Sequence, residues 1–170
     1  QVVAPTIAWS GTSLTISSET GANFYEIYVD DVLYASTSNL TYDFNGYAEI
    51  GSHTIKVKAI AVTTASQSGT TYTIYTDSDY SSTVSLVVSQ LDTPTLSFGS
   101  SVFTWTSITN ATYYDFYLNN VLVQSSADLS YTVSSTNGTG YVIAQGTPTS
   151  TSGTLTIYLS SLPSQTLGYG

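Results

Sequence analysis

The chain has no cysteine, no methionine and no arginine, and only two lysines and one histidine among its 170 residues. Without cysteine, a disulfide framework, a thiolate metal site and a cysteine nucleophile are all excluded. Eleven acidic residues against two lysines give a net charge of −9. The chain therefore offers no basic face for nucleic acid or for an anionic membrane surface. No apolar run approaches the length of a membrane span, so we expect no membrane insertion.

Groups that could perform acid–base or nucleophilic catalysis are also scarce. His53 is the single histidine, and it opens a predicted strand beside a turn, where a surface position is expected. Serines are so frequent that pairing one of them with His53 and an aspartate carries no information. We therefore predict a protein that is not an enzyme and that binds no cofactor.

Serine and threonine make up about a third of the chain, and 15 tyrosines, five phenylalanines and two tryptophans supply apolar area for a core. A surface of hydroxyls and tyrosine in place of lysine and glutamate is typical of secreted or particle-surface β proteins. We therefore expect an extracellular, cell-surface or virion-surface location. Because there is no methionine and the chain begins at Gln1, we also expect it to be part of a longer translation product.

The sequence repeats itself. Residues Ala22–Leu33 return as Ala111–Leu122, 89 residues later, and the same offset holds without a gap over about 40 positions. That length is typical of one small β-sandwich, so we predict two tandem domains. Their predicted bounds are 1–91 and 92–170, with a short linker around Gln90–Pro94.

The dominant periodicity is two, which is the period of a half-buried strand. Alternation predicts that Tyr25, Ile27 and Val29 point into the first core and that their neighbours point outward. By the same offset Tyr114, Phe116 and Leu118 point into the second core. In the strand that begins at His53, the predicted inward set is Ile55, Val57 and Ala59, which leaves Lys56 and Lys58 on the solvent side. Asp30-Asp31 and Asn119-Asn120 are predicted two-residue hairpin turns, because Asp and Asn tolerate positive φ.

The pattern Pro94-Thr95-Leu96, then Phe103-x-Trp105, then Tyr114-Asp115-Phe116-Tyr117 resembles a fibronectin type III-like module, with a generic immunoglobulin-like sandwich close behind. The resemblance implies an all-β fold of two tandem, seven-stranded antiparallel sandwiches. It also implies core positions for Trp105 and Tyr114, with Ile16 in place of the tryptophan in the first copy. Such modules resemble those of bacterial surface proteins, phage structural proteins and secreted polysaccharide-degrading enzymes, and they share no common chemistry.

The two copies differ after Tyr42 and Tyr131. The first copy has a longer stretch, which predicts an inserted hairpin around residues 65–80 and a location where binding loops often lie. The second copy runs more directly through Gly146-Thr147-Pro148 to Gly153. Its last residues, Ser160–Gly170, are predicted to form a C-terminal tail.

The sequence allows two kinds of surface site, an aromatic contact site and a cation site. Exposed aromatics beside carboxylates can stack on sugar rings or contact another protein, although cross-strand tyrosine pairs also stabilise a sheet. The candidates are Tyr28 with Glu26, Tyr117 with Asp115, and Tyr72 and Tyr75 in the inserted hairpin. Asp30-Asp31 and Asp77-x-Asp79 carry hard oxygen ligands of the kind calcium uses, but exposed turn residues are the simpler interpretation, and we predict no metal site.

These observations favour a non-enzymatic structural or adhesive surface protein, such as a phage particle, filament or cell-surface stalk subunit. Its partners would be other protein subunits or copies of itself, because a face rich in tyrosine and hydroxyl groups, with little charge and few lysines, does little to oppose edge pairing. The alternative is a carbohydrate-binding accessory module of a larger secreted enzyme, with a glycan as its partner.

Overall fold

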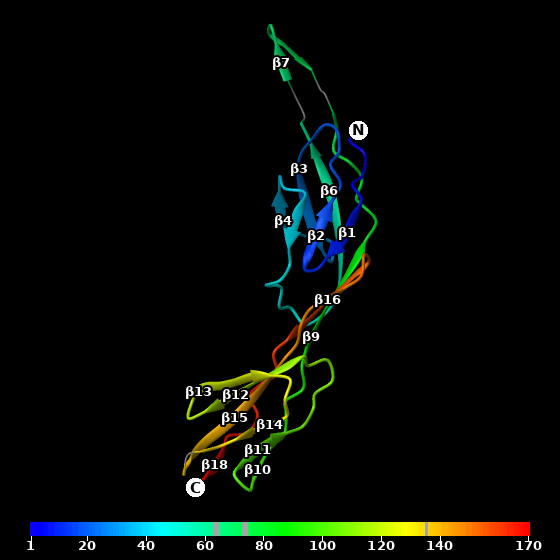
Figure 1. Ribbon diagram of the computed structural model, residues 1–170. Helices are drawn as coiled ribbons and strands as arrows, with labels where there is room; N and C mark the ends of the chain where they lie inside the picture. The colour runs from blue at the N-terminus through cyan, green and yellow to red at the C-terminus, as the bar shows by residue number, and fades with distance from the viewer. Residues whose placement is uncertain (63–64, 73–74, 135) are drawn as a thin grey trace. The chain divides into compact units, whose positions relative to one another are not determined.

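The computed structural model describes residues 1–62, 65–72, 75–134 and 136–170, and every regular element in these ranges is a β-strand (Figure 1). None of the elements in these ranges is a helix that could cross a membrane. The residues form two compact units, of which the first comprises Gln1–Val87 and Pro148–Thr156. The second comprises Val88–Thr147 and Ile157–Gly170. The all-β class expected from the sequence period is confirmed.

The first unit combines a three-stranded antiparallel sheet with a larger sheet, in which β17 runs parallel to β9. The small sheet has the order β1-β2-β5 and the larger one β16-β17-β9-β6-β3-β4. Strands β9 and β17 contribute residues to both units. The bounds of the strands are β1 (Ile7–Ser10), β2 (Ser13–Ile16), β3 (Ala22–Val29), β4 (Val32–Thr37), β5 (Thr41–Asp43), β6 (Gly51–Ala61), β9 (Val84–Gln90), β16 (Thr149–Ser150) and β17 (Thr154–Leu159).

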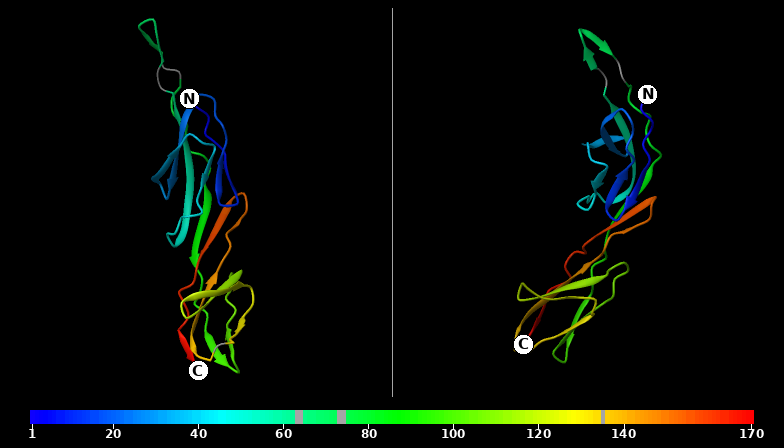
Figure 2. Two further views of the ribbon diagram at one scale, coloured as in Figure 1. Left: turned by 60° about the vertical axis from the view of Figure 1, so that its left-hand side comes forward. Right: turned by 45° about the horizontal axis from the view of Figure 1, so that its top comes forward.

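The second unit repeats this arrangement. Its sheets have the orders β10-β11-β14 and β13-β12-β15-β18, and Figure 2 shows them from two further directions. Here β18 occupies the place that β9 has beside β6. The bounds are β10 (Leu96–Gly99), β11 (Val102–Trp105), β12 (Tyr113–Leu118), β13 (Val121–Ser126), β14 (Ser130–Thr132), β15 (Gly138–Gln145) and β18 (Leu167–Tyr169).

The cores lie between the paired sheets and follow the predicted alternation. Tyr25, Ile27 and Val29 are buried on β3, and Ile55, Val57 and Ala59 are fully buried on β6. In the second unit the ring of Trp105 stacks on Phe116, with centroids 5.2 Å apart, inside a cluster that includes Tyr114. Lys56 and Lys58 lie on the outer side of β6, but their side chains are only 21% and 28% exposed because each reaches an aspartate, Asp31 and Asp77 respectively.

Positive φ angles turn both central hairpins as predicted. Asp30 and Asp31 have φ of 49° and 68° between β3 and β4, and Asn119 and Asn120 have 50° and 62° between β12 and β13. Two successive residues in this region make the turn that matches the right-handed twist of the strands. Each hairpin also has a register shift shortly before its turn, between Ile27 and Tyr28 in the first and between Phe116 and Tyr117 in the second.

The connection after the long central strand carries a hairpin in both repeats. In the first repeat it is β7 (Ala65–Gln67) with β8 (Thr70–Tyr72), within the stretch where an insertion was predicted. In the second repeat β16 pairs with β17, so the direct path expected there was wrong. The alternation of polar and apolar residues at the start of Thr154–Leu159 has the period of a strand, but it does not show that this strand belongs to a hairpin.

Residues Ser160–Gly170 differ from the tail that the sequence predicted. Ser161 and Ser164 are buried, and β18 pairs with β15 along Gly138–Gly140. The segment is therefore the closing strand of the second sandwich. Its polar composition concealed this role, because the buried side chains here are serines that bond to the main chain.

Candidate functional site

In each unit a pair of buried serines binds the chain to the long central strand, which is β6 in the first unit and β15 in the second. Ser78 Oγ accepts a 2.8 Å hydrogen bond from the main-chain N–H of Ala59, while the Ser78 N–H donates to the Ala59 carbonyl at 3.0 Å. Ser81 bonds in the same two ways to Val57. Each serine thereby satisfies both polar groups of a buried strand residue, which would otherwise lack partners.

The second unit has the same pair 83 residues later. Ser161 bonds to Ala144 through its hydroxyl and its N–H, both at 2.9 Å. Ser164 does the same with Val142, at 3.0 and 2.9 Å. Because the hairpins precede these serines in both repeats, the serine pairs fix the point at which each hairpin returns to its sheet.

Residues of the second repeat complete the edge of the first unit. The N–H of Ser85 on β9 donates to the carbonyl of Gly153 at 2.8 Å, and the N–H of Trp9 donates to the carbonyl of Ser152 at 3.0 Å. Leu155 in the same hairpin is fully buried. In Figures 1 and 2 the orange hairpin lies alongside the green strand β9. This is strand addition to an open sheet edge, with main-chain hydrogen bonds and one apolar anchor.

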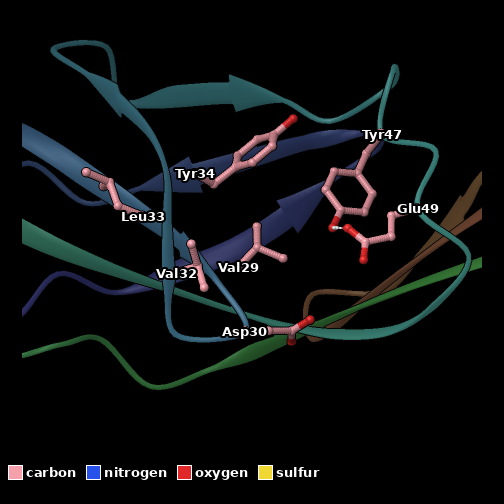
Figure 3. A pocket seen from close by; sticks show the side chains of 7 residues that line it. All are labelled: Val29, Asp30, Val32, Leu33, Tyr34, Tyr47 and Glu49. Carbon is pink, nitrogen blue, oxygen red and sulfur yellow. Dashed lines mark hydrogen bonds between the residues drawn. The ribbon is translucent and has the colours of Figure 1, made fainter.

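A pocket of about 290 Å³ opens beside the β3–β4 turn of the first unit. Figure 3 shows Tyr34 and Tyr47 on its wall, with the Tyr47 hydroxyl directed at Glu49. That hydroxyl donates to Glu49 Oε2 at 3.2 Å, and burial followed by this bond raises the pKa of Tyr47 to about 12. Asp30 and three apolar residues complete the lining, which is partly open, since Val32 and Leu33 are 68% and 51% exposed. An aromatic wall beside a carboxylate can accept a sugar ring or an apolar side chain of a partner.

His53 contacts two residues of this pocket, Asp30 and Glu49, and is buried, with 7% exposure, so the predicted surface position was wrong. Its Nδ1 is 2.7 Å from Asp30 Oδ2, and its Nε2 is 3.0 Å from the carbonyl oxygen of Glu49. Both partners are acceptors, so the doubly protonated imidazolium satisfies both contacts. The bond to Asp30 raises the pKa of His53, and bonds from the Thr54 N–H and from His53 lower the pKa of Asp30. The pair fixes the β3–β4 turn against β6.

The predicted aromatic residues lie in cross-strand clusters. Tyr28 donates to Glu26 at 2.6 Å and packs edge-on against Tyr80, with ring centroids 5.1 Å apart. The bond to Glu26, followed by burial, raises the pKa of Tyr28. Lys56 Nζ lies 4.0 Å from the centre of the Tyr80 ring. The structure thus brings Tyr28 and Glu26 together, within a cluster that also uses Tyr80 and Lys56.

In the second unit Tyr117 stacks on Tyr141, with centroids 4.8 Å apart and an interplanar angle of 6°. Asp115 accepts a hydrogen bond from Gln145 Nε2 at 2.8 Å. Tyr75 is half-buried against Gly21, and the side chain of Tyr72 lies outside what the structure describes. The glycan interpretation of all six residues stays a prediction.

The aspartates weighed as calcium ligands have other partners. Asp30 holds His53 and Thr54, and Asp77 accepts from the Ala61 N–H and lies 3.4 Å from Lys58 Nζ. In the part of the chain that the structure describes, no three His, Asp or Glu side chains gather in a way that could hold a metal ion. The sequence predicted that these aspartates lie in turns. Which groups they contact depends on the strand register, which the sequence did not give.

Comparison with known proteins finds likeness at the level of solved structures. One, "Structures of Clostridium thermocellum CbhA fibronectin(III)-like modules", is 18% identical with a TM-score of 0.37, over 99% of this chain and 92% of that one. Another, "Central Fibronectin-III array of RIM-binding protein", is 16% identical with a TM-score of 0.30, over 85% of this chain and 62% of that one. No family model matches the chain, and no curated protein matches it.

Both units are fibronectin type III-like sandwiches. The assignment follows from the strand order itself, with three strands in one sheet and the longer strands in the other, in each unit. A fold of this kind fixes no chemistry. The hairpins, the serine pairs and the pocket are the features of these units that bear on function.

Proposed function

We propose that this chain is a non-enzymatic structural surface protein whose modules are joined by strand addition. The observation that carries the proposal is the place of Pro148–Thr156 in the first unit. Main-chain bonds from Ser85 and Trp9 hold this segment, and the buried Leu155 anchors it. A module that gives a hairpin to the sheet of the module before it gains an attachment that a flexible linker does not provide.

The composition supports the same proposal. The hairpin residues 149–156 carry no charge, and neither do Trp9, Ser85 and Leu86 on the receiving side. Strand addition depends on main-chain groups, so it tolerates such a neutral, hydroxyl-rich surface. Scarce lysine and arginine also leave few cleavage sites for trypsin-like proteases. Both features suit an extracellular coat, filament, stalk or virion surface, and the mechanism is mechanical connection rather than chemistry.

Electron microscopy of native source material, with gold-labelled antibodies against this chain, tests the proposal. Regular spacing of the label along a filament, stalk or particle is the expected result. Label on dispersed single molecules, without any ordered assembly, would overturn it. Light scattering on the isolated chain, run alongside, separates assembly of the protein itself from association with other material.

A carbohydrate-binding role is the second candidate, and the pocket beside Tyr34 favours it. This pocket combines aromatic rings with the Glu49 carboxylate, the groups that stack on and hydrogen-bond to a sugar. A glycan screen with the intact chain and with Tyr34→Ala tests it, with Leu40→Ala as the control. Leu40 is similarly exposed, at 42% against 45%, and is not part of the pocket lining. Retention of a glycan that only Tyr34→Ala abolishes would support this candidate.

A further inference from the structure

The pocket beside the β3–β4 turn is built partly from a stretch that the second repeat lacks. The offset between equivalent residues is 89 up to β5 and β14 but 85 at β6 and β15, as the strand pairs show: Leu14–Tyr42 with Phe103–Tyr131, and Tyr25–Ala59 with Tyr114–Ala144. The connection between β5 and β6 is therefore four residues longer, the difference between these two offsets. It carries Tyr47 and Glu49 of the pocket lining. Because a second copy of the sandwich lacks this extra stretch, its place in a pocket points to binding.

Tyr34 supplies the second ring of the pocket. The register of β3 and β4 shifts so that Tyr34 is the extra residue on β4, and a bulge of this kind re-aims side chains. The Tyr34 ring stacks on Phe44, with centroids 5.5 Å apart, and lies 5.6 Å from the Tyr47 ring. It is nevertheless 45% exposed. Figure 3 shows both rings and the Glu49 side chain around the same opening.

The charge of this lining is negative, since Asp30 and Glu49 are its charged residues. In the described ranges each lysine and the histidine has an acidic partner: Lys56 with Asp31, Lys58 with Asp77, and His53 with Asp30. These ion pairs leave Glu49 without a cation. Burial, then the bond and charge of Glu49 and the charge of Asp30, raise the pKa of Tyr47 to about 12. The same charges would stabilise a cation placed beside the Tyr47 hydroxyl.

The outer face of the same sheet shows how such groups hold a cation. Lys56 Nζ lies 4.0 Å from the centre of the Tyr80 ring and pairs with the Asp31 carboxylate. A tyrosine ring and a carboxylate together therefore bind an ammonium group in this molecule. The pocket has two such rings beside Glu49, and its cation must come from another molecule.

An arginine side chain matches these groups. Its planar guanidinium stacks on an aromatic ring while its N–H groups donate to a carboxylate. Its aliphatic stem can lie on the apolar rim, where Val32 and Leu33 are 68% and 51% exposed. The 170 residues contain no arginine, so a second copy of them cannot supply one. Arginine is also enriched among the residues that dominate binding at protein interfaces.

We infer that the pocket of the first unit binds an arginine side chain of a different protein, with the guanidinium against the Tyr34 ring and paired with Glu49. The inference goes beyond the proposed function, because the bonds that hold the hairpin at β9 come from Ser85 and Trp9 and not from the pocket. Its failure would leave the strand addition unaffected. It also differs from the glycan candidate, since a neutral sugar needs no opposite charge.

NMR titration of the isotope-labelled full chain with a blocked leucine–arginine–leucine peptide tests the inference. The matched peptide carries citrulline, which has nearly the same shape as arginine but no charge. The arginine peptide should bind with a Kd on the order of 1 mM or tighter and shift the amide resonances of Tyr34 and Glu49. The citrulline peptide should bind at least about fivefold more weakly. Added salt should weaken only the arginine peptide, because salt screens an exposed ion pair.

Variants of the chain locate the bound peptide. Glu49→Gln keeps an acceptor for the Tyr47 hydroxyl but removes the charge, and should weaken binding about fivefold. Tyr34→Ala removes the ring and should weaken it about three- to fivefold, whereas Tyr34→Phe should bind like the parent. Glu19→Gln is the control for net charge, because Glu19 is not part of the pocket lining, and it should also bind like the parent.

The opposite outcomes are equally clear. A parent chain that binds neither peptide, or both equally, overturns the inference, and so does unchanged binding in Glu49→Gln. A blocked glycine–arginine–glycine peptide should bind more weakly than the leucine-flanked one, because Val32 and Leu33 offer apolar contacts to the neighbours of the arginine. Equal binding of these two peptides would mean that the pocket takes a free guanidinium compound and not a partner protein. A neutral glycan that is lost in Tyr34→Ala but kept in Glu49→Gln would decide for the glycan candidate instead.

Discussion

The main-chain N–H of Ser85 donates a 2.8 Å hydrogen bond to the carbonyl of Gly153, a residue of the other repeat. The bond places part of the second repeat in the first compact unit. We therefore expect folding of the first sandwich to depend on sequence beyond residue 91, the predicted boundary of the first domain. Cutting the chain at this boundary would expose the edge of β9 and uncover the apolar site at Trp9.

Leu155→Ala tests this dependence. Leu155 is fully buried, and truncation of a buried leucine costs about 2–5 kcal/mol of unfolding free energy. Trp9 belongs to the first unit and Trp105 to the second, so in a Trp105→Phe background the urea-induced fluorescence change reports the first unit alone. The first unit should unfold at clearly lower urea in the variant. Leu162→Ala is the control, because Leu162 is 63% exposed and should change stability by less than about 0.5 kcal/mol. Equal curves for both variants would contradict the assignment.

Ser161→Ala tests the serine pair. The variant removes the hydroxyl that accepts from the Ala144 N–H and leaves a buried main-chain donor without that partner, at a cost of about 1–3 kcal/mol. The amide of Ala144 should exchange faster with solvent, and the second unit should unfold at lower denaturant. Ser97→Ala on β10, where the residue is exposed, provides the comparison and should behave like the parent. Undiminished protection of Ala144 would show that the hydroxyl is dispensable.

The single histidine allows a direct pH test by NMR. Asp30 raises the pKa of His53 above its ordinary 6.5, so the stabilisation from this proton is present below 6.5 and is lost as pH rises through the raised pKa. The lowered pKa of Asp30 gives stabilisation that is present above its ordinary 3.8 and is lost as pH falls through the lowered value. The pair therefore contributes most between about pH 4 and 6.5.

Asp30→Asn should lower the pKa of His53 and flatten the loss of stability at higher pH. Asp31→Asn is the matched control, because Asp31 is 81% exposed and pairs with Lys56 instead. The imidazole resonances of His53, followed from pH 4 to 9, measure both effects. An unchanged titration in Asp30→Asn would mean that the ion pair does not form in solution.

The repeat offset predicted the parts of the fold that depend on local pattern. The inward alternation from Tyr25 and from Tyr114, and the positive φ of Asp30 and Asn119, follow from side-chain periodicity and from which residues tolerate a left-handed turn. These features use only neighbours in sequence. For that reason they could be read without knowing which strands pair.

Features that depend on strand register could not be read in this way. The serine pairs escaped detection because the offset changes from 89 to 83 between the third strand and the last, owing to hairpins and connections of different length. The partner of His53 lies across the β3–β6 pair, so its burial had no signal in the local sequence. The sheet that receives Leu155 could not be predicted either. The alternation in Thr154–Leu159 fits any half-buried strand and does not indicate which sheet that strand joins.

The Tyr117–Tyr141 stack separates a structural from a glycan role for the outer aromatics. The rings are parallel and 4.8 Å apart, and an aromatic pair of this kind contributes about 0.5–1.5 kcal/mol beyond its area. A double-mutant cycle with Tyr117→Ala and Tyr141→Ala should recover that coupling energy in the unfolding free energy of the second unit. The same variants, tested in a glycan screen, should show no change in retention. If Tyr117→Ala unfolds like the parent but loses a glycan, then Tyr117 is a ligand-binding residue, and its contact with Tyr141 only positions it.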